Sequence, residues 1–469
     1  MLSIIVAHES KRGIGCLNSL PWNIPEDIKY FKKVTCHVTS ILEKNVVVMG
    51  RNTWESIPKK FRPLSDRVNV VLTSNKNYKV PEGVFLVHSL EQIRSIIKNQ
   101  NSFIIGGESL YRQFINEADK IYSTEIYYNY KSCDKFFPQI PKCFALQTIS
   151  PFLFDNNIHY RNLVYINKEK HPEESIWKNK EEQAFLDCME NIIKTGIKRE
   201  DRTGIGTLST FGNTLKYNLQ DTFPLMTTKR MFTRGVFEEL MFYLRGQTDT
   251  KILDEKGVSI WNANTTRDFL DKRGLLQLPE GDMGETYGFN FRHFGAQYEN
   301  CKTDYAEDGF DQLEYVVDLI KNNPESRRII IDIWNCSTIN NAALPPCLCK
   351  YQFYVDTENK RLNLMIYIRS SDFFLANNWN TCTGAFFVHL ICNLNGIDLS
   401  PGELTVVSGD THVYLSHLDA VETNLKRTPK PFPKIIVKNK HDNITDFEWS
   451  DIKLLGYNPE SSIPASMAV

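Results

Sequence analysis

The chain has 469 residues, of which 42% are hydrophobic and 24% are charged, and its formal net charge is -1. This length exceeds what one ordinary core accommodates and predicts two or three domains. The composition excludes an intrinsically disordered chain, and the balanced charge excludes a protein drawn to nucleic acid or anionic lipid by its overall field, so any anion site must be local.

The opening segment and the cysteines bear on the compartment. Residues 1–13, MLSIIVAHESKRG, form an apolar run interrupted by His8 and Glu9, which is too short for a signal-peptide core or a membrane span; we expect a buried first strand. The eleven cysteines include no CxxC pair, and Cys347 and Cys349 form only a CxC without nearby histidines. We therefore predict a cytoplasmic protein with reduced thiols, no metal ion and no membrane partner.

Short β-branched runs alternate with short amphipathic helical patterns up to residue 167. The runs predict buried strands at residues 2–7, 45–50, 68–73 and 102–107. The helical patterns lie at residues 90–100 and 108–118. Because such alternation is typical of α/β folds, residues 1–167 are predicted to form an α/β domain with a mostly parallel central sheet.

The texture of the sequence changes after a polar, charged stretch at residues 168–179, which we predict to be a short linker. Longer helical patterns follow at residues 181–196, 237–246, 311–323 and 384–396. Strand patterns lie between them at residues 327–334, 350–355 and 361–368. Residues 180–469 are therefore predicted to form an α+β domain.

An acidic residue near the start of the first predicted helix is a candidate for chemistry. Pro25 begins this helix, which places Asp27, Ile28 and Phe31 on one face. An acid in a first turn is most often a surface group that compensates the helix dipole. The alternative is that a carboxylate beside Trp22 and Phe31, partly shielded from water, orients a protonatable heterocycle.

Two strand-to-helix turns in the same domain suit a phosphate. Gly50 leads from a buried run into Arg51 at a predicted helix start, where free N–H groups lie next to a guanidinium. Gly106 and Gly107 occupy an equivalent place further on, where a backbone is able to approach a pyrophosphate closely. Taken singly, each turn also has an interpretation as ordinary turn chemistry.

The ordered motifs LPW, PEDIxxF, GRxTWES, RPLxxRxNVVLTS, IIGGxxLYxQF and IYxTxI resemble dihydrofolate reductase from residue 1 to about 165. The resemblance implies that Asp27 holds the pteridine and assists its protonation, with Trp22 and Thr124 in its hydrogen-bond network. It implies a folate pocket lined by Ile28, Phe31, Ile57 and Leu64, with Arg67 on the glutamate carboxylate of the substrate. For NADPH it implies Ala7 and Ile14 at the nicotinamide, Gly50, Arg51, Thr53, Gly106 and Gly107 at the phosphates, and Arg51 with Ser74 at the 2′-phosphate.

The second domain carries arginines in short motifs and a cysteine between prolines and a strand. Arg202, Arg327, Arg328 and Arg369 are each most often solvated surface groups, whereas four converging guanidinium groups would bind a phosphate dianion. Cys347 follows Pro-Pro and would be held rigidly. Alone it is best interpreted as a buried inert cysteine, but nearby arginines would favour the thiolate that nucleophilic attack requires.

The motifs DRTGIGT, FPLMTTKR, EELMFYLRG, SIWNAN, GETYGFNFRHFGA, ESRRIIIDIWN, LPPC, RSSD, GDTHVY and a terminal MAV follow in the order found in thymidylate synthase, over residues 180–469. The resemblance implies that Cys347 adds to C6 of dUMP, so that C5 takes the methylene of 5,10-methylenetetrahydrofolate. It implies a phosphate site made by Arg202, Arg369, Ser370 and, from the neighbouring subunit of a homodimer, Arg327 and Arg328.

The same resemblance implies roles for further residues. Asn380 would bind the edge of the uracil, and His412 and Tyr414 the deoxyribose hydroxyl. Proton transfers would be organised by Glu239, Asn264 and Tyr287. Asp372, which belongs to the set of residues at the dUMP site, would bind the pterin ring. Lys229 would bind the folate tail, and Val469 would close over the site.

Several positions depart from the synthase pattern. Leu348 stands where a histidine is usual, Ile368 where a glutamine is usual, and Asn262 where an aspartate is usual. The other departures are Thr286 for proline and Ala376, Asn378 and Trp379 for glycine, proline and phenylalanine. Each lost polar contact to the pyrimidine would cost ~1–3 kcal/mol and slow the reaction.

Together the two resemblances predict a bifunctional enzyme. Thymidylate synthesis of this type leaves dihydrofolate, which is the substrate of the other half, so dUMP and folates are the expected partners. The alternative is an active reductase whose synthase half is impaired and serves mainly as a dimerisation scaffold. A role in binding nucleic acid is at best secondary, because the sequence has no basic stripe.

Overall fold

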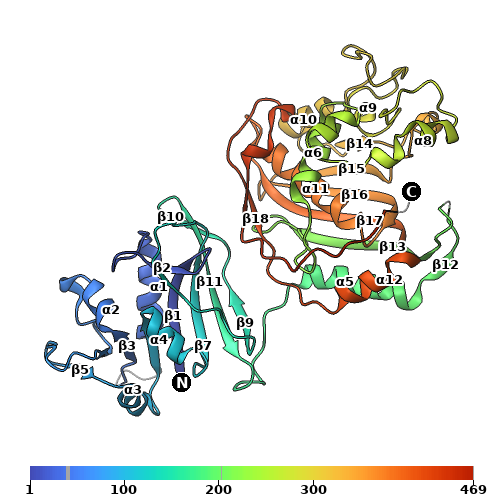
Figure 1. The fold of residues 1–469 in the computed structure, drawn as a ribbon. Helices are drawn as coiled ribbons and strands as arrows, with labels where there is room; N and C mark the ends of the chain where they lie inside the picture. The colour runs from blue at the N-terminus through green and yellow to red at the C-terminus, as the bar shows by residue number, and fades with distance from the viewer. Residues whose placement is uncertain (39–42, 202, 468–469) are drawn as a thin grey trace. The chain divides into compact units, whose positions relative to one another are not determined.

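The computed structural model describes residues 1–38, 43–201 and 203–467 and divides into two compact units, Met1–Trp177 and Lys178–Val469 (Figure 1). Part of the predicted linker folds against the first unit. The N–H of Lys168 donates to the carbonyl of Cys143 at 2.8 Å, and that of Trp177 donates to the carbonyl of Leu146 at 2.9 Å. The limits predicted for the two domains stay a prediction.

A mostly parallel sheet forms the centre of the first unit, with the strand order β10-β11-β7-β1-β6-β3-β4-β5 and β9 paired with β11. Neighbours from β7 to β5 are parallel, whereas β11 runs antiparallel to β7, β9 and β10. The strands of this unit are β1 Leu2–Glu9, β2 Gly13–Gly15, β3 Val46–Gly50, β4 Val68–Leu72, β5 Val84–Val87, β6 Ser102–Gly106, β7 Lys120–Ile126, β8 Lys135–Phe136, β9 Phe144–Ile149, β10 Leu153–Asp155 and β11 Ile158–Asn167.

The helices of the first unit cover a sheet that is buried on both faces. The runs in β1, β3, β4 and β6 are continuously apolar because each strand has a hydrophobic cluster on either side. These helices are α1 Pro25–Cys36, α2 Arg51–Ser56, α3 Leu90–Ile97 and α4 Glu108–Phe114. Proline begins α1, and a capping box between Ser89 and Gln92 begins α3.

The second unit is built on a mixed sheet with the order β12-β13-β17-β16-β15-β14, in which only β16 and β17 are parallel among the described strands. A small ribbon pairs β18 with β19. The strands are β12 Ile197–Arg199, β13 Thr207–Asn218, β14 Ile330–Asp332, β15 Leu348–Asp356, β16 Arg361–Asp372, β17 Ser400–Tyr414, β18 Lys434–Val437 and β19 Ile452–Leu455.

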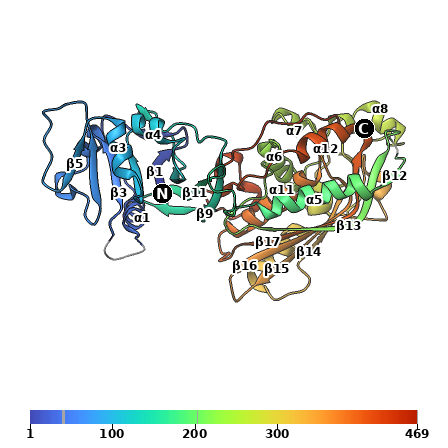
Figure 2. The same ribbon diagram turned by 90° about the horizontal axis from the view of Figure 1, so that it is seen from below.

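The main helices of the second unit pack on one face of this sheet (Figure 2). The long helix α11 runs through the core, because nearly all of its residues are buried and those from Ala385 to Cys392 are apolar apart from His389. The helices are α5 Lys180–Thr195, α6 Thr233–Leu244, α7 Lys251–Glu255, α8 Arg267–Lys272, α9 Tyr287–Arg292, α10 Gln312–Asn322, α11 Asn377–Cys392 and α12 Leu418–Leu425.

The predicted fold classes are confirmed, with an α/β first unit around a mostly parallel sheet and an α+β second unit. Within the described ranges, no helix has both the length and the apolar character needed to cross a bilayer.

A histidine inside α11 makes the stability of the second unit depend on pH. His389 is buried against the ring of Phe223, and its Nε2 has no hydrogen-bond partner among the described residues. Burial, reinforced by Lys434, lowers the pKa of His389 from 6.5 to about 4.

The fold therefore favours the neutral ring, and stability that is complete above pH 6.5 is lost as the pH falls toward about 4. Between pH 7 and pH 5 the free energy of unfolding should drop by ~2 kcal/mol from this group. Urea titrations followed by tryptophan fluorescence should show that His389→Phe lowers this pH dependence. An equal loss in both proteins would mean that His389 is not the responsible group.

Candidate active sites

A cleft of about 1850 Å³ opens in the first unit above the carboxyl ends of its parallel strands. It brings together nearly all of the residues predicted for the folate and NADPH sites. Those that line it are Ala7, Ile14, Asp27, Ile28, Phe31, Gly50, Arg51, Thr53, Ile57, Leu64, Arg67, Ser74, Gly106, Gly107 and Thr124. Ile28 is 58% exposed within it, so an apolar side chain faces the open space.

The carboxylate of Asp27 is anchored at one side of this cleft. The hydroxyl of Thr124, on β7, donates to Oδ1 of Asp27 at 2.6 Å. Burial raises the pKa of Asp27, and the hydrogen bond from Thr124 opposes that rise. No described residue hydrogen-bonds the second oxygen, Oδ2, which leaves it free to bond a molecule in the cleft.

Trp22 is the predicted folate-site residue that is absent from the lining of the cleft. It is buried beside Ile24 and Ile126 and does not line the cleft. Its indole Nε1 has no hydrogen-bond partner within the described part of the chain. The network predicted around Asp27 therefore contains Thr124 directly, and the role of Trp22 stays a prediction.

Arg67 is held as a fixed cation at the other end of the cleft. Its Nε donates to the carbonyl of Ser65 at 2.9 Å and its Nη1 to the hydroxyl of Thr35 at 2.8 Å, while the guanidinium lies over the ring of Phe31. Burial lowers the pKa of Arg67, although an arginine remains charged. The sequence reasoning missed Thr35, one turn beyond Phe31 on α1.

The glycines after β3 and β6 make room for a close approach. Gly106 has φ of 140°, and a Cβ there would lie 3.0 Å from Oγ1 of Thr53. For the corresponding position on Gly50, no described residue other than its two chain neighbours comes within 4 Å. Backbone groups at both turns are therefore accessible from the cleft, as a bound phosphate requires.

A second cleft, of about 900 Å³, opens in the second unit at the ends of β15, β16 and β17. The predicted residues that line it are Cys347, Arg369, Ser370, Asp372, His412 and Tyr414. Residues 199–201 line it too, immediately before the position of Arg202. Arg202 and Val469 lie outside the described residues.

Cys347 is half-buried in this cleft with a rigid backbone. Its N–H donates to the hydroxyl of Tyr287 at 2.8 Å, and its carbonyl accepts from the N–H of Arg369 at 2.9 Å. The Arg369 guanidinium bonds the carbonyls of Pro345 and Pro346, at 3.0 and 2.9 Å. A permanent positive charge is thereby fixed beside the segment that carries the thiol.

A charged pair that the sequence reasoning did not single out positions His412. Nδ1 of His412 lies 2.8 Å from Oδ1 of Asp410, and Nη1 of Arg199 donates to Oδ2 of Asp410 at 2.8 Å. Asp410 lies two residues before His412 in the GDTHVY motif. Because side chains alternate between the two faces of a strand, this spacing places both side chains on the same face of β17 and was the signal in the sequence.

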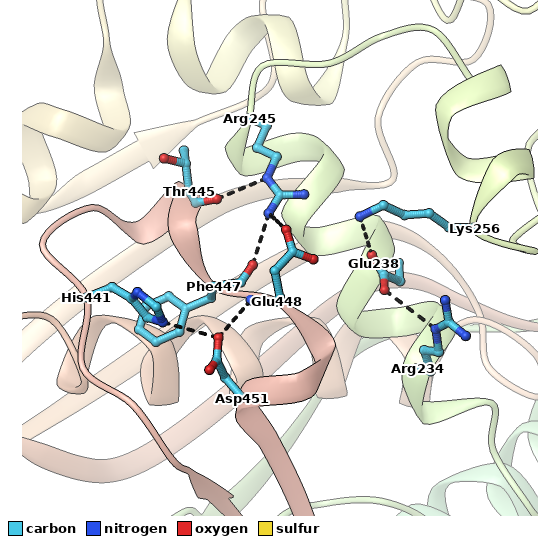
Figure 3. A network of polar contacts seen from close by, with 9 residues as sticks. All are labelled: Arg234, Glu238, Arg245, Lys256, His441, Thr445, Phe447, Glu448 and Asp451. Carbon is cyan, nitrogen blue, oxygen red and sulfur yellow. Dashed lines mark hydrogen bonds and ion pairs between the residues drawn. The ribbon is translucent and has the colours of Figure 1, made fainter.

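Two consecutive glutamates on α6 have opposite surroundings. Glu238 forms ion pairs with Lys256 at 2.6 Å and with Arg234 at 3.6 Å (Figure 3). Glu239 points instead into an aromatic cage, where it accepts from Tyr243, Trp261 and Trp379. Burial raises the pKa of Glu239, and these three hydrogen bonds oppose the rise.

The remaining predicted residues are not part of the lining of the second cleft. Lys229 is buried, donates to the carbonyl of Phe374 and lies over its ring, and burial lowers its pKa to about 8. Asn380 lies on α11 and Asn264 is buried. Arg327 and Arg328 are exposed on the approach to β14 and line neither cleft.

Four of the departures from the synthase pattern contact other residues of this chain, whereas Oγ1 of Thr286 is buried without a hydrogen-bond partner among the described residues. Leu348 and Ile368 lie directly opposite each other on β15 and β16, and both are buried. Where a histidine and a glutamine are usual, this chain therefore has two apolar side chains on the same face of the sheet. Asn378 donates to the carbonyl of Pro224 at 2.9 Å, and Asn262 donates to Asp254 at 2.8 Å.

The described ranges contain no group of three or more histidine, cysteine or acidic side chains that would hold a metal ion.

Comparison with known proteins assigns both units. A family model for dihydrofolate reductase matches residues 1–166, and one for thymidylate synthase matches residues 183–469. A putative bifunctional dihydrofolate reductase-thymidylate synthase of Oryza sativa subsp. japonica is 39% identical over 498 residues, covering 97% of this chain and 100% of that protein. The bifunctional proteins of Paramecium tetraurelia and Leishmania major are 39% and 37% identical and cover 98% and 95% of their own lengths, with 100% of this chain in each case.

Proposed function

Because the chain belongs to the family of bifunctional dihydrofolate reductase-thymidylate synthases, we propose that it methylates dUMP to dTMP with 5,10-methylenetetrahydrofolate and reduces the resulting dihydrofolate with NADPH. The observation that carries the proposal is the presence, in one chain, of a cleft with a shielded carboxylate and a second cleft with a cysteine beside a fixed guanidinium.

In the reductase cleft, Asp27 would hold the pteridine and assist its protonation. Its bond from Thr124 fixes one oxygen, so Oδ2 faces the substrate. Arg67 would pair with the glutamate carboxylate at the far end, and Ile28 and Phe31 would contact the rings between the two charges. These residues bind and orient the substrate, which is the main task of the protein in a cofactor-dependent transfer.

The turns at Gly50 and Gly106 fit NADPH. A side chain on Gly106 would meet Thr53, so the close backbone approach at this turn depends on glycine. Gly50, Thr53 and Gly107 would bind the phosphates, and Arg51 with Ser74 the 2′-phosphate. When bound, NADPH supplies the hydride.

In the synthase cleft, the thiolate of Cys347 would add to C6 of dUMP and make C5 nucleophilic. Arg369 and Ser370 would bind the phosphate, and His412, oriented by Asp410, the deoxyribose hydroxyl together with Tyr414. Tyr287 accepts the N–H of Cys347, and Glu239 accepts the hydroxyl of Tyr243. Tyr287 and Glu239 would organise the proton transfers.

We do not favour an impaired synthase half. Leu348 and Ile368 form a buried apolar pair on neighbouring strands, and Asn262 and Asn378 each have hydrogen-bond partners, although Oγ1 of Thr286 has none among the described residues. The groups that attack, bond or neutralise charge in the cleft are retained.

The test is a coupled assay with dUMP, methylenetetrahydrofolate and NADPH. Formation of dTMP should be accompanied by oxidation of one NADPH for each dihydrofolate produced. A protein that reduces dihydrofolate but forms no dTMP would favour the scaffold alternative. Binding of RNA that depends strongly on salt would revive a nucleic-acid role.

The second unit is also proposed to form a homodimer through the open face of its sheet, opposite α5 and α11 (Figure 2). Large apolar side chains are exposed on its strands: Phe211 on β13 is 83% exposed and Tyr354 on β15 is 68% exposed, with Met365 and Tyr367 on β16. A face of this kind is typical of an interface between subunits.

A two-fold dimer in which Arg327 and Arg328 complete the partner's phosphate site predicts complementation. A double Arg327→Ala/Arg328→Ala variant and Cys347→Ala should each form little dTMP. After mixed refolding, about a quarter of the sites should be active, because half of the dimers are mixed and each has one complete site. No recovery, with dimers present by sedimentation, would show that the arginines act within their own chain.

The proposal includes three further points: the domain limits 1–167 and 180–469 with a linker at 168–179, a cytoplasmic location, and, as partners, dUMP, folates and a second copy of the chain.

A further inference from the structure

One donor to Glu239 comes from a position at which the chain departs from the synthase pattern. The indole N–H of Trp379, on α11, donates to Oε2 of Glu239, on α6, at 2.6 Å. The usual residue at this position is phenylalanine, which has no N–H to donate. A chain with the usual phenylalanine would therefore lack this hydrogen bond.

The two carboxylate oxygens of Glu239 accept different numbers of hydrogen bonds. Oε1 accepts from the hydroxyl of Tyr243 and from Nε1 of Trp261, both at 2.8 Å. Oε2 accepts from Trp379 alone among residues 1–38, 43–201 and 203–467. Since a carboxylate oxygen has two lone-pair positions, the free one is on Oε2. A proton that enters or leaves Glu239 is thus exchanged at the oxygen that Trp379 bonds.

Packing fixes the indole in this position. A Cβ on Gly235, one turn before Glu239 on α6, would lie 2.9 Å from Cη2 of Trp379. The missing side chain on Gly235 therefore makes room for the indole against the helix. The donor is held by the contact of α11 with α6 rather than by a mobile loop.

The cage is connected to the nucleophile. The ring of Tyr243 stacks on that of Tyr287 with centroids 4.7 Å apart, and the edge of Trp261 also meets Tyr287. The hydroxyl of Tyr287 accepts the N–H of Cys347 at 2.8 Å. A change in the position or charge of Glu239 is therefore transmitted through Tyr243 and Tyr287 to the part of the cleft that holds Cys347.

We propose that Trp379 is a positioning residue of the synthase site, whose N–H fixes Oε2 of Glu239 and stabilises the ionised carboxylate for proton exchange during methylation. The inference rests on the proposed synthase function. Hydrogen bonds to an ionised group favour that form, so loss of the Trp379 bond leaves the effect of burial less opposed and raises the pKa of Glu239 further.

The test is Trp379→Phe, which keeps an aromatic ring and removes the N–H. The limb of the pH profile of synthase kcat that Glu239 controls should move to higher pH by ~1 unit. Trp449→Phe is the matched control, because Trp449 packs on Phe237 of the same helix and makes no bond to Glu239. In a Glu239→Gln background this limb of the pH profile should be absent, and adding Trp379→Phe should cause no further change in the profile.

A readout without turnover separates this inference from the proposed function. Infrared titration of the carboxyl stretch, assigned with Glu239→Gln, should give a higher pKa for Glu239 in Trp379→Phe than in the parent protein. An unchanged titration, or an equal shift in Trp449→Phe, would overturn the role of Trp379 even if dTMP forms. If no dTMP forms, the proposed function fails, and the infrared result still decides whether Trp379 controls Glu239.

Discussion

Replacement of Cys347 by alanine is expected to abolish dTMP formation, by roughly 10³-fold or more, while dihydrofolate reduction continues. Cys347 is the one cysteine among the described residues that lines the second cleft, and it adjoins the guanidinium of Arg369. The thiol two residues on, Cys349, is buried and donates toward the carbonyl of Pro346, and burial raises its pKa to about 11. It is therefore unable to replace Cys347 as a nucleophile at neutral pH.

Cys349→Ala supplies the matched control, because it makes the same chemical change on the same strand segment. It should retain most dTMP formation, with some loss of stability from the small cavity. Product would be measured by chromatography of dTMP, and reductase activity by NADPH oxidation with added dihydrofolate. Turnover in Cys347→Ala at the rate of the Cys349→Ala enzyme would exclude covalent attack by Cys347.

The sequence predicted local features of the fold and of the first cleft well. The start of α1 at Pro25 follows from the fixed backbone angle of proline, and the buried parallel strands follow from continuous apolar runs. Asp27 lies in the cleft on the first turn of α1. Such features depend on a few neighbouring residues, which is why their order along the chain identifies them.

Contacts between distant segments were not predictable in the same way. The bond of Trp379 to Glu239 spans 140 residues and depends on how α11 packs against α6. Leu348 and Ile368 lie opposite each other only because of the register of β15 on β16. Without that register, the sequence shows two separate replacements of polar residues and not a pair. Neither packing nor register is contained in the pattern of one segment.

Asp27→Asn is expected to lower dihydrofolate reduction by roughly 10²-fold or more and to leave dTMP formation intact. The substitution keeps the shape of the side chain that Thr124 contacts but removes the charge that would hold a protonated pteridine. Glu26→Gln is the matched control on the adjacent position, because Glu26 is exposed and pairs with Lys29 at 2.5 Å. NADPH oxidation with dihydrofolate measures the first activity, and the dTMP assay measures the second.

Stability distinguishes a chemical role of Asp27 from a structural one. Burial raises its pKa in the folded protein, so its contribution is favourable below the unfolded pKa and is lost as the pH rises through the folded one. At neutral pH the ionised carboxylate therefore costs folding free energy, and Asp27→Asn should unfold at the same or a higher urea concentration. An inactive but equally stable or more stable variant would show that the charge is retained for the reaction and not for the fold, whereas a less stable one would contradict this role.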